Sequence, residues 1–156
     1  AFGQRELGCL GYMRDEVPYM YATSFKKHTK NSVFSNNEIT ILPKVGIAYY
    51  YAGADASILK YMSETHDGIV IAGSGSGNYS QSWKDMINKL YHEKGTLFVR
   101  SSRVNQGIVF ESSIFDPQAI CVPANTLSAQ KARVLLMLAL TKTRDLKQIK
   151  DIFDEY

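Results

Sequence analysis

Residues 68–78 constrain the fold most strongly, because a short apolar strand there runs directly into a glycine-rich loop. Their sequence is Gly-Ile-Val-Ile-Ala-Gly-Ser-Gly-Ser-Gly-Asn. Beyond the loop, apolar side chains recur with the spacing of one buried helical face, at Trp83, Met86, Ile87, Leu90 and Tyr91. The stretch therefore predicts a strand, a tight loop and a helix in immediate succession.

Three glycines alternate in this loop, at Gly73, Gly75 and Gly77. Glycine accepts positive φ and lets a ligand or another backbone segment approach closely, and a helix N-terminus favours negative charge. One interpretation is therefore a ligand-binding loop. The other is a structural turn that leads a parallel strand into its crossover helix, and the glycines alone do not decide between the two.

Size and charge narrow the function classes. The chain has 156 residues, 45% of them apolar, which suits a single domain with one sizeable core. Its net charge of +3 is spread along the sequence, and the cluster at Lys26, Lys27, His28 and Lys30 is too short to indicate nucleic acid, so we interpret it as a solvated loop. The longest apolar run, 134–140, is far shorter than a membrane span. We therefore expect neither nucleic acid nor a membrane as a partner.

The sequence does not determine the cellular compartment of the protein. Cys9 and Cys121 lie far apart without metal-type spacing, so their pairing state and the redox compartment are not fixed. No secretory signal is visible. The chain begins at Ala1 rather than at Met, so a signal or a whole domain could have preceded it.

The pattern of the chain changes at Pro43. Before it, the apolar segments 10–13 and 17–21 flank a charged triplet, which predicts a hairpin. We therefore expect residues 1–42 to form a hairpin and a linker, and residues 43–156 to form an α/β domain.

From residue 44 onward, short apolar runs alternate with helical periods. Four of these runs predict buried strands, at 45–52, 69–72, 96–100 and 119–122. Residues that favour helix N-termini precede the helical periods, at Asp55, at Ser128 and, with Gln148 three residues on, at Asp145.

Strand-helix units in succession imply an α/β fold with a mostly parallel four-stranded sheet and helices on both faces. Such sheets bind ligands at the carboxyl ends of their strands, where residues 51–55, 73–78 and 101–106 would gather. The strand order stays open. The helix predicted at 128–142 is nearly apolar all round, so we expect a subunit interface to cover part of it.

A phosphate or NADP site is one candidate for the glycine-rich loop. The match to G-x-G-x-x-G is partial, because Asn78 stands where the third glycine belongs and no acidic residue ends the next strand. That strand ends instead near Arg100 and Arg103, which could grip a ribose phosphate. Alternatively, the two arginines pair with buried carboxylates or carbonyls.

A self-contained hydrolytic site is not visible. His28, His66 and His92 lie in separate regions, and none neighbours a Ser or Cys in a recognised nucleophile spacing. We therefore expect no catalytic residue and no metal site within this sequence.

Five blocks in one order carry a resemblance to a known family. They are Lys-His-Thr at 27–29, Lys-Val-Gly-Ile at 44–47, residues 67–78, Val-Arg-Ser-Ser-Arg-Val at 99–104 followed by Gly107, and residues 125–143. Together they resemble the C-terminal half of a bacterial type II L-asparaginase, the kind with a threonine nucleophile. The similarity extends over the whole chain.

The resemblance implies a hydrolase that converts L-asparagine to L-aspartate and ammonia without a cofactor. Such enzymes often hydrolyse L-glutamine as well, but less efficiently. It also implies a homotetramer built as a dimer of intimate dimers, in which each active site lies between the N-terminal domain of one subunit and the C-terminal domain of its pair mate. The nucleophile would belong to the N-terminal domain, which this sequence lacks. A periplasmic location is implied, with the cytoplasm as the alternative.

Two substrate-binding residues are implied by the resemblance. Asn78 matches an asparagine that reaches the neighbouring site and helps to hold the amino group of the substrate. The family also places a glutamate after the Arg-Ser-Ser-Arg block, and the resemblance implies that it pairs with the same amino group. Counting from Gly107 puts Ser113 or Ile114 at that place, and Glu111, the nearby carboxylate, needs a gap to align.

Two other functions stay open beside the asparaginase. The first is a phosphate- or NADP-binding α/β domain. The second is a noncatalytic domain that pairs subunits through the apolar helix 128–142.

Overall fold

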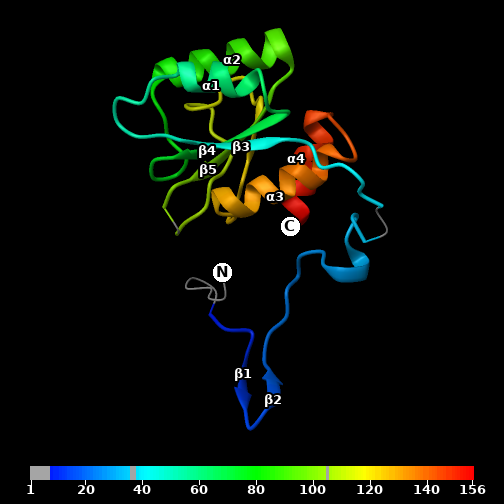
Figure 1. Ribbon diagram of the computed structural model, residues 1–156. Coiled ribbons are helices and arrows are strands. Elements are labelled where there is room, and N and C mark those ends of the chain that lie inside the picture. Colours follow the sequence, from blue (N-terminus) through cyan, green and yellow to red (C-terminus); the bar gives the residue numbers. More distant parts are fainter. Residues whose placement is uncertain (1–7, 36–37, 105) are drawn as a thin grey trace.

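The computed structural model describes residues 8–35, 38–104 and 106–156 (Figure 1). The N-terminal part contains β1 (Gly11–Arg14), β2 (Val17–Met20) and the short 3-10 helix η1 (Thr29–Asn31). The rest contains, in chain order, β3 (Val45–Tyr49), α1 (Ser57–Ser63), β4 (Gly68–Gly73), α2 (Gln81–Lys94), β5 (Leu97–Ser102), β6 (Cys121–Pro123), α3 (Ala129–Leu140) and α4 (Leu146–Glu155).

Strands β3 to β6 form one sheet in the order β3-β4-β5-β6, and every neighbouring pair is parallel. This confirms the predicted four-stranded sheet and supplies the strand order that the sequence left open. Val45 is opposite Gly68, which is in turn opposite Leu97. All four strands therefore end at one edge, and the loops that follow β3, β4 and β5 meet there.

Helices cover both faces of the sheet, as predicted: α1 and α2 lie on one face, and α3 and α4 on the other (Figure 1). Side chains of a strand alternate between the two faces. Ile69 and Ile71 of β4 pack in the core under α1 and α2, with Trp83, whereas Val70 and Ala72 pack in the core under α3 and α4. The central strands are buried on both sides, which explains their continuous apolar runs.

The expectation of a helix after each strand fails at one place. In the described part of 103–120, which joins β5 to β6, no helix forms. This segment carries Gly107 and Pro117, and both residue types are unfavourable in a helix interior. It is instead a long loop that pairs with the residues after β6, through mutual backbone hydrogen bonds between Val109 and Asn125.

Two of the three predicted helix caps are confirmed. Ser128 Oγ accepts a hydrogen bond from the Lys131 amide, and a carboxylate oxygen of Asp145 accepts one from the Gln148 amide. At α1 the expected cap is shifted, because Ala56 occupies the cap position. Asp55 instead accepts from the Ser57 amide at 2.8 Å, and this bond lowers the pKa of Asp55.

The apolar helix α3 is covered largely by its own domain. Its residues Ala132, Leu136 and Ala139 are fully buried against the sheet and α4. Val134 points elsewhere and is 52% exposed. Two-sided cover from the sheet and α4 therefore accounts for most of the apolar pattern, and the predicted subunit interface stays a prediction.

The predicted N-terminal hairpin is confirmed. Strands β1 and β2 pair in antiparallel fashion, with Gly11 opposite Met20, and extend away from the α/β domain (Figure 1). The division between linker and domain at residue 43 stays a prediction.

The linker after the hairpin contacts the end of α4. Lys27 donates its backbone amide to the Glu155 carbonyl and its ammonium to the Glu155 carboxylate, and Lys26 Nζ donates to the Asp154 carbonyl. Cations are favourable at a helix C-terminus. The basic cluster is exposed, as expected, and two of its lysines fasten the linker to α4. Among the described helices, none is long and apolar enough to span a membrane.

Candidate functional site

The glycine-rich loop at the carboxyl end of β4 is closed on itself. Ser74 and Asn78 exchange two backbone hydrogen bonds, of 2.9 and 2.7 Å. Gly75 and Gly77 between them have positive φ, of 52° and 82°. The backbone groups of Ser74 and Asn78 are thus used within the loop itself.

Two of the glycines are required by close backbone packing. A Cβ atom on Gly73 would lie 2.5 Å from the Gly77 carbonyl carbon, and one on Gly77 would lie 3.0 Å from Val109 Cγ1 and 3.2 Å from the Ser101 carbonyl oxygen. The structural interpretation therefore explains these two positions. Helix α2 begins only at Gln81, so the loop does not form the helix N-terminus that a phosphate-binding loop would use.

The two arginines at the end of β5 both bind carbonyl oxygens. Arg100 donates to the Phe110 and Ser76 carbonyls at 3.2 and 3.3 Å and is only 3% exposed, and Arg103 donates to the Tyr50 carbonyl. Their geometry confirms the alternative in which the arginines serve structural carbonyls. A ribose phosphate would have to displace these hydrogen bonds, so the structure does not support an NADP site at this loop.

Asn78 is half-buried at the end of the locked loop. Its backbone is held by Ser74, and the next residue, Tyr79, is buried with its hydroxyl donating to the Phe115 carbonyl at 3.1 Å. Burial raises the pKa of Tyr79, so this hydroxyl stays protonated. Within the described part of the chain, the Asn78 side-chain amide has no hydrogen bond. The structure therefore holds the backbone of Asn78 rigidly and leaves its amide available.

A cavity of about 220 Å³ lies beside the loop. Its walls are Gly75, Ser76, Ser102, Val104, Gln106, Gly107, Ile108 and Val109. Pockets that enclose a small-molecule ligand usually measure roughly 300 to 1,000 Å³. This cavity alone is therefore smaller than a typical enclosing site, which suits a surface that contributes one wall to a larger one.

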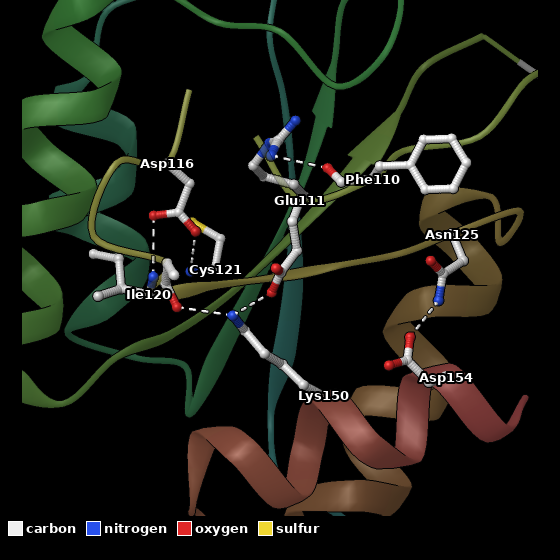
Figure 2. A network of polar contacts seen from close by, with 10 residues as sticks. Phe110, Glu111, Asp116, Ile120, Cys121, Asn125, Lys150 and Asp154 are labelled. Carbon is white, nitrogen blue, oxygen red and sulfur yellow. Dashed lines mark hydrogen bonds and ion pairs between the residues drawn. The ribbon is translucent and has the colours of Figure 1, made fainter. Parts of the chain in front are cut away.

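Glu111 lies against α4 and forms no bond with Asn78. Its Oε1 accepts from Lys150 Nζ at 2.7 Å, and the same ammonium donates to the Ala119 carbonyl, as Figure 2 shows. This ion pair holds the pKa of Glu111 below its usual range. The other residues at the ambiguous place, Ser113 and Ile114, are both exposed.

Asp116 is a buried carboxylate in the loop before β6. Its two oxygens accept from the Ile120 and Cys121 amides at 3.0 and 2.7 Å (Figure 2). These bonds fix the turn that leads into β6. The signal for this role was the Asp-Pro pair at 116–117, which is typical of turns.

The described residues contain no hydrolytic constellation. His28, His66 and His92 contact different neighbours, and burial raises the pKa of Cys121 to about 12. Nor do the His, Cys, Asp and Glu residues of the described ranges gather into a group able to hold a metal ion. Among the described residues, neither cysteine is therefore paired with a histidine as its base.

Comparison with protein families finds that residues 44–153 match the Glutaminase/Asparaginase C-terminal domain. The chain belongs to this family. The match spans the whole parallel sheet and its helices, and includes the glycine-rich loop with Asn78.

Relatives of this glutaminase/asparaginase domain carry asparaginase names. The chain is 41% identical to L-asparaginase 2 of Escherichia coli over 96% of its length and 43% of that protein. It is 37% identical to the glutaminase-asparaginase of Acinetobacter glutaminasificans, over 96% of the chain and 46% of the relative. It is 36% identical to a protein of Haemophilus influenzae named "probable L-asparaginase periplasmic", over 99% of the chain and 45% of the relative.

A solved structure shares the fold. The crystal structure named "probable cytoplasmic L-asparaginase" from Campylobacter jejuni matches with a TM-score of 0.88 and 42% identity, over 96% of this chain and 48% of that one. The chain thus spans less than half the length of these relatives. Since their names include both a periplasmic and a cytoplasmic protein, both locations are open.

Proposed function

We propose that this chain is the C-terminal part of an L-asparaginase, which hydrolyses L-asparagine to L-aspartate and ammonia, with L-glutamine as a second substrate. The observation that carries the proposal is the side-chain amide of Asn78, which has no hydrogen bond among the described residues and follows β4 in a domain of the asparaginase family. The nucleophile would lie in a preceding domain. No cofactor is needed for this reaction.

Asn78 is proposed to hold the amino group of the substrate. Its side-chain carbonyl can accept a hydrogen bond from an ammonium without placing a second charge in a half-buried position. The rigid backbone on both sides would keep the amide aligned before the substrate arrives, which reduces the entropy lost on binding.

The exposed hairpin is proposed to pack on that preceding domain. Tyr12, Met13, Met20 and Tyr21 are all more than half exposed in this chain. Apolar side chains gathered on one projecting element are typical of an interface. This surface and the exposed Val134 of α3 support an assembly of two-domain subunits, for which we propose the homotetramer made of intimate dimers.

Replacing Asn78 tests the site. In the complete protein, Asn78→Ala should raise the KM for asparagine and lower kcat/KM by about 1.5 to 3 kcal/mol, the value of one hydrogen bond to a charged group. That corresponds to a loss of between about tenfold and 150-fold. The measurement is ammonia release at varied asparagine concentration.

Ser80→Ala is the matched control for this prediction. Ser80 lies two residues on, and its hydroxyl contacts only Ser82 among the described residues. Both variants should melt close to the wild-type temperature. A sharply lowered melting temperature for Asn78→Ala, with normal kinetics in the surviving enzyme, would mean that Asn78 only supports the loop.

Glu111 stays a candidate second anchor for the ammonium. Glu111→Gln keeps an oxygen that can accept from Lys150 but removes the charge that would attract the substrate. We expect the KM for asparagine to rise by less than in Asn78→Ala, because Lys150 already holds one carboxylate oxygen. The melting temperature should change little, since an exposed ion pair contributes about 0 to 1 kcal/mol.

An unchanged KM of Glu111→Gln would contradict the proposed role of Glu111. A KM equal to that of the wild type would assign Glu111 to the contact with α4 alone. The carboxylate that pairs with the substrate ammonium would then have to be sought among other residues of the complete protein.

A further inference from the structure

Arg100 of β5 connects two segments that surround the proposed binding residue. One terminal nitrogen of its guanidinium donates to the Ser76 carbonyl of the glycine-rich loop, and the other donates to the Phe110 carbonyl of the loop before β6. The second of these bonds is visible at Phe110 in Figure 2. Ser76 is two residues from Asn78, so Arg100 contacts the loop close to its functional end.

The surroundings of Arg100 are unusual for a buried cation. It is 3% exposed, and among the described residues no carboxylate pairs with it. The guanidinium carbon of Arg100 lies 5.9 Å from the centroid of the Phe115 ring. Its Nε is buried and has no hydrogen-bond partner among the described residues. A buried charge or unpaired donor is unfavourable, and an apolar side chain could fill the same space. Packing alone therefore does not explain an arginine here.

Other groups of the same strand end bind the loop beside Arg100. Ser102 Oγ donates to the Gly75 carbonyl, and the Arg103 amide donates to the Gly73 carbonyl at 2.9 Å. With Ser76, three loop carbonyls are thus bound from residues 100–103. The loop is fixed to β5 rather than to the helix that follows it.

We infer that Arg100 is a positioning residue for Asn78: by holding the Ser76 carbonyl and the Phe110 carbonyl together, it fixes the loop in the orientation that presents the Asn78 amide to the substrate. This inference rests on the proposed function. Arg100 itself does not touch the substrate, because its guanidinium is buried beneath the loop carbonyls that it binds.

A double-mutant cycle in the complete protein tests the inference. Arg100→Met alone should lower kcat/KM for asparagine between about tenfold and 100-fold, mainly through KM, because a small displacement of a binding group has effects of this size. In the Asn78→Ala background, Arg100→Met should lower kcat/KM by less than about threefold further, since residues that act through one another are not additive. Arg100→Lys should recover part of the loss.

Arg103→Met is the matched control, because Arg103 is exposed and its guanidinium binds only the Tyr50 carbonyl among the described residues. It should stay within about twofold of wild-type kcat/KM. If the Asn78 and Arg100 effects multiply in the double variant, Arg100 does not act through Asn78 and the inference is overturned.

The same variants separate a folding defect at Arg100 from a failure of the proposed function. Should Arg100→Met not fold, the cycle is carried out with Arg100→Lys; if neither folds, Arg100 is a folding residue and the inference is wrong. A complete wild-type protein that releases no ammonia from asparagine, or an Asn78→Ala variant with wild-type kinetics, would overturn the proposed function instead.

Discussion

Purified residues 1–156 should release no ammonia from L-asparagine above the buffer rate. Amide hydrolysis by covalent catalysis needs a nucleophile within reach of a base. In the described residues the three histidines lie apart, and the buried Cys121, with a pKa of about 12, stays a thiol at neutral pH. The measurement is ammonia production by this chain under conditions in which the complete protein is active.

The control for this assay is a folded chain. Trp83 is fully buried and its indole donates to the Ala54 carbonyl, so its fluorescence and near-ultraviolet circular dichroism report the native core. Ammonia release well above buffer from such a sample would place catalytic groups within this chain and contradict the assignment of chemistry to a preceding domain.

The layout of the sheet could be predicted because its strands are continuous apolar runs separated by helical periods. The order of the strands could not, since it depends on which runs pair across long separations. Asp55 illustrates the limit of local rules: it lies before α1 as expected, but Ala56 intervenes, so its carboxylate binds Ser57 without being the cap residue.

The glycine-rich loop could be located but not interpreted from sequence. Alternating glycines fit both a ligand loop and a close backbone contact, and the structure supports the second through the close packing around Gly73 and Gly77. Arg100 presented the same difficulty, because its residue type does not reveal whether it is buried. Its carbonyl partners, Ser76 and Phe110, are 24 and 10 residues away.

The two proposed binding residues were not equally predictable from the sequence. The family resemblance indicated Asn78, and the structure adds that its side-chain amide has no hydrogen bond among the described residues. Glu111 was placed only with a gap, and its partner Lys150 lies 39 residues on, in α4. No local pattern could have indicated that pairing.

We propose that this domain completes the active site of a partner subunit, so that the smallest working unit is a dimer. Two variants of the complete protein with impaired sites test this proposal. One lacks the nucleophile of the preceding domain, and the other carries Asn78→Ala together with Glu111→Ala. Each homodimer then contains only crippled sites. In a mixed dimer, the nucleophile of the second chain and the intact Asn78 of the first meet in one site.

The decisive measurement is ammonia release after the two variants are mixed equally and subunit exchange is verified. Random exchange makes half of the dimers mixed and half of their sites whole, so about a quarter of wild-type activity should return. Each variant incubated alone is the control and should stay near its own background. No recovery in the mixture would mean that the site is built within one chain, and the role given to Asn78 would be wrong.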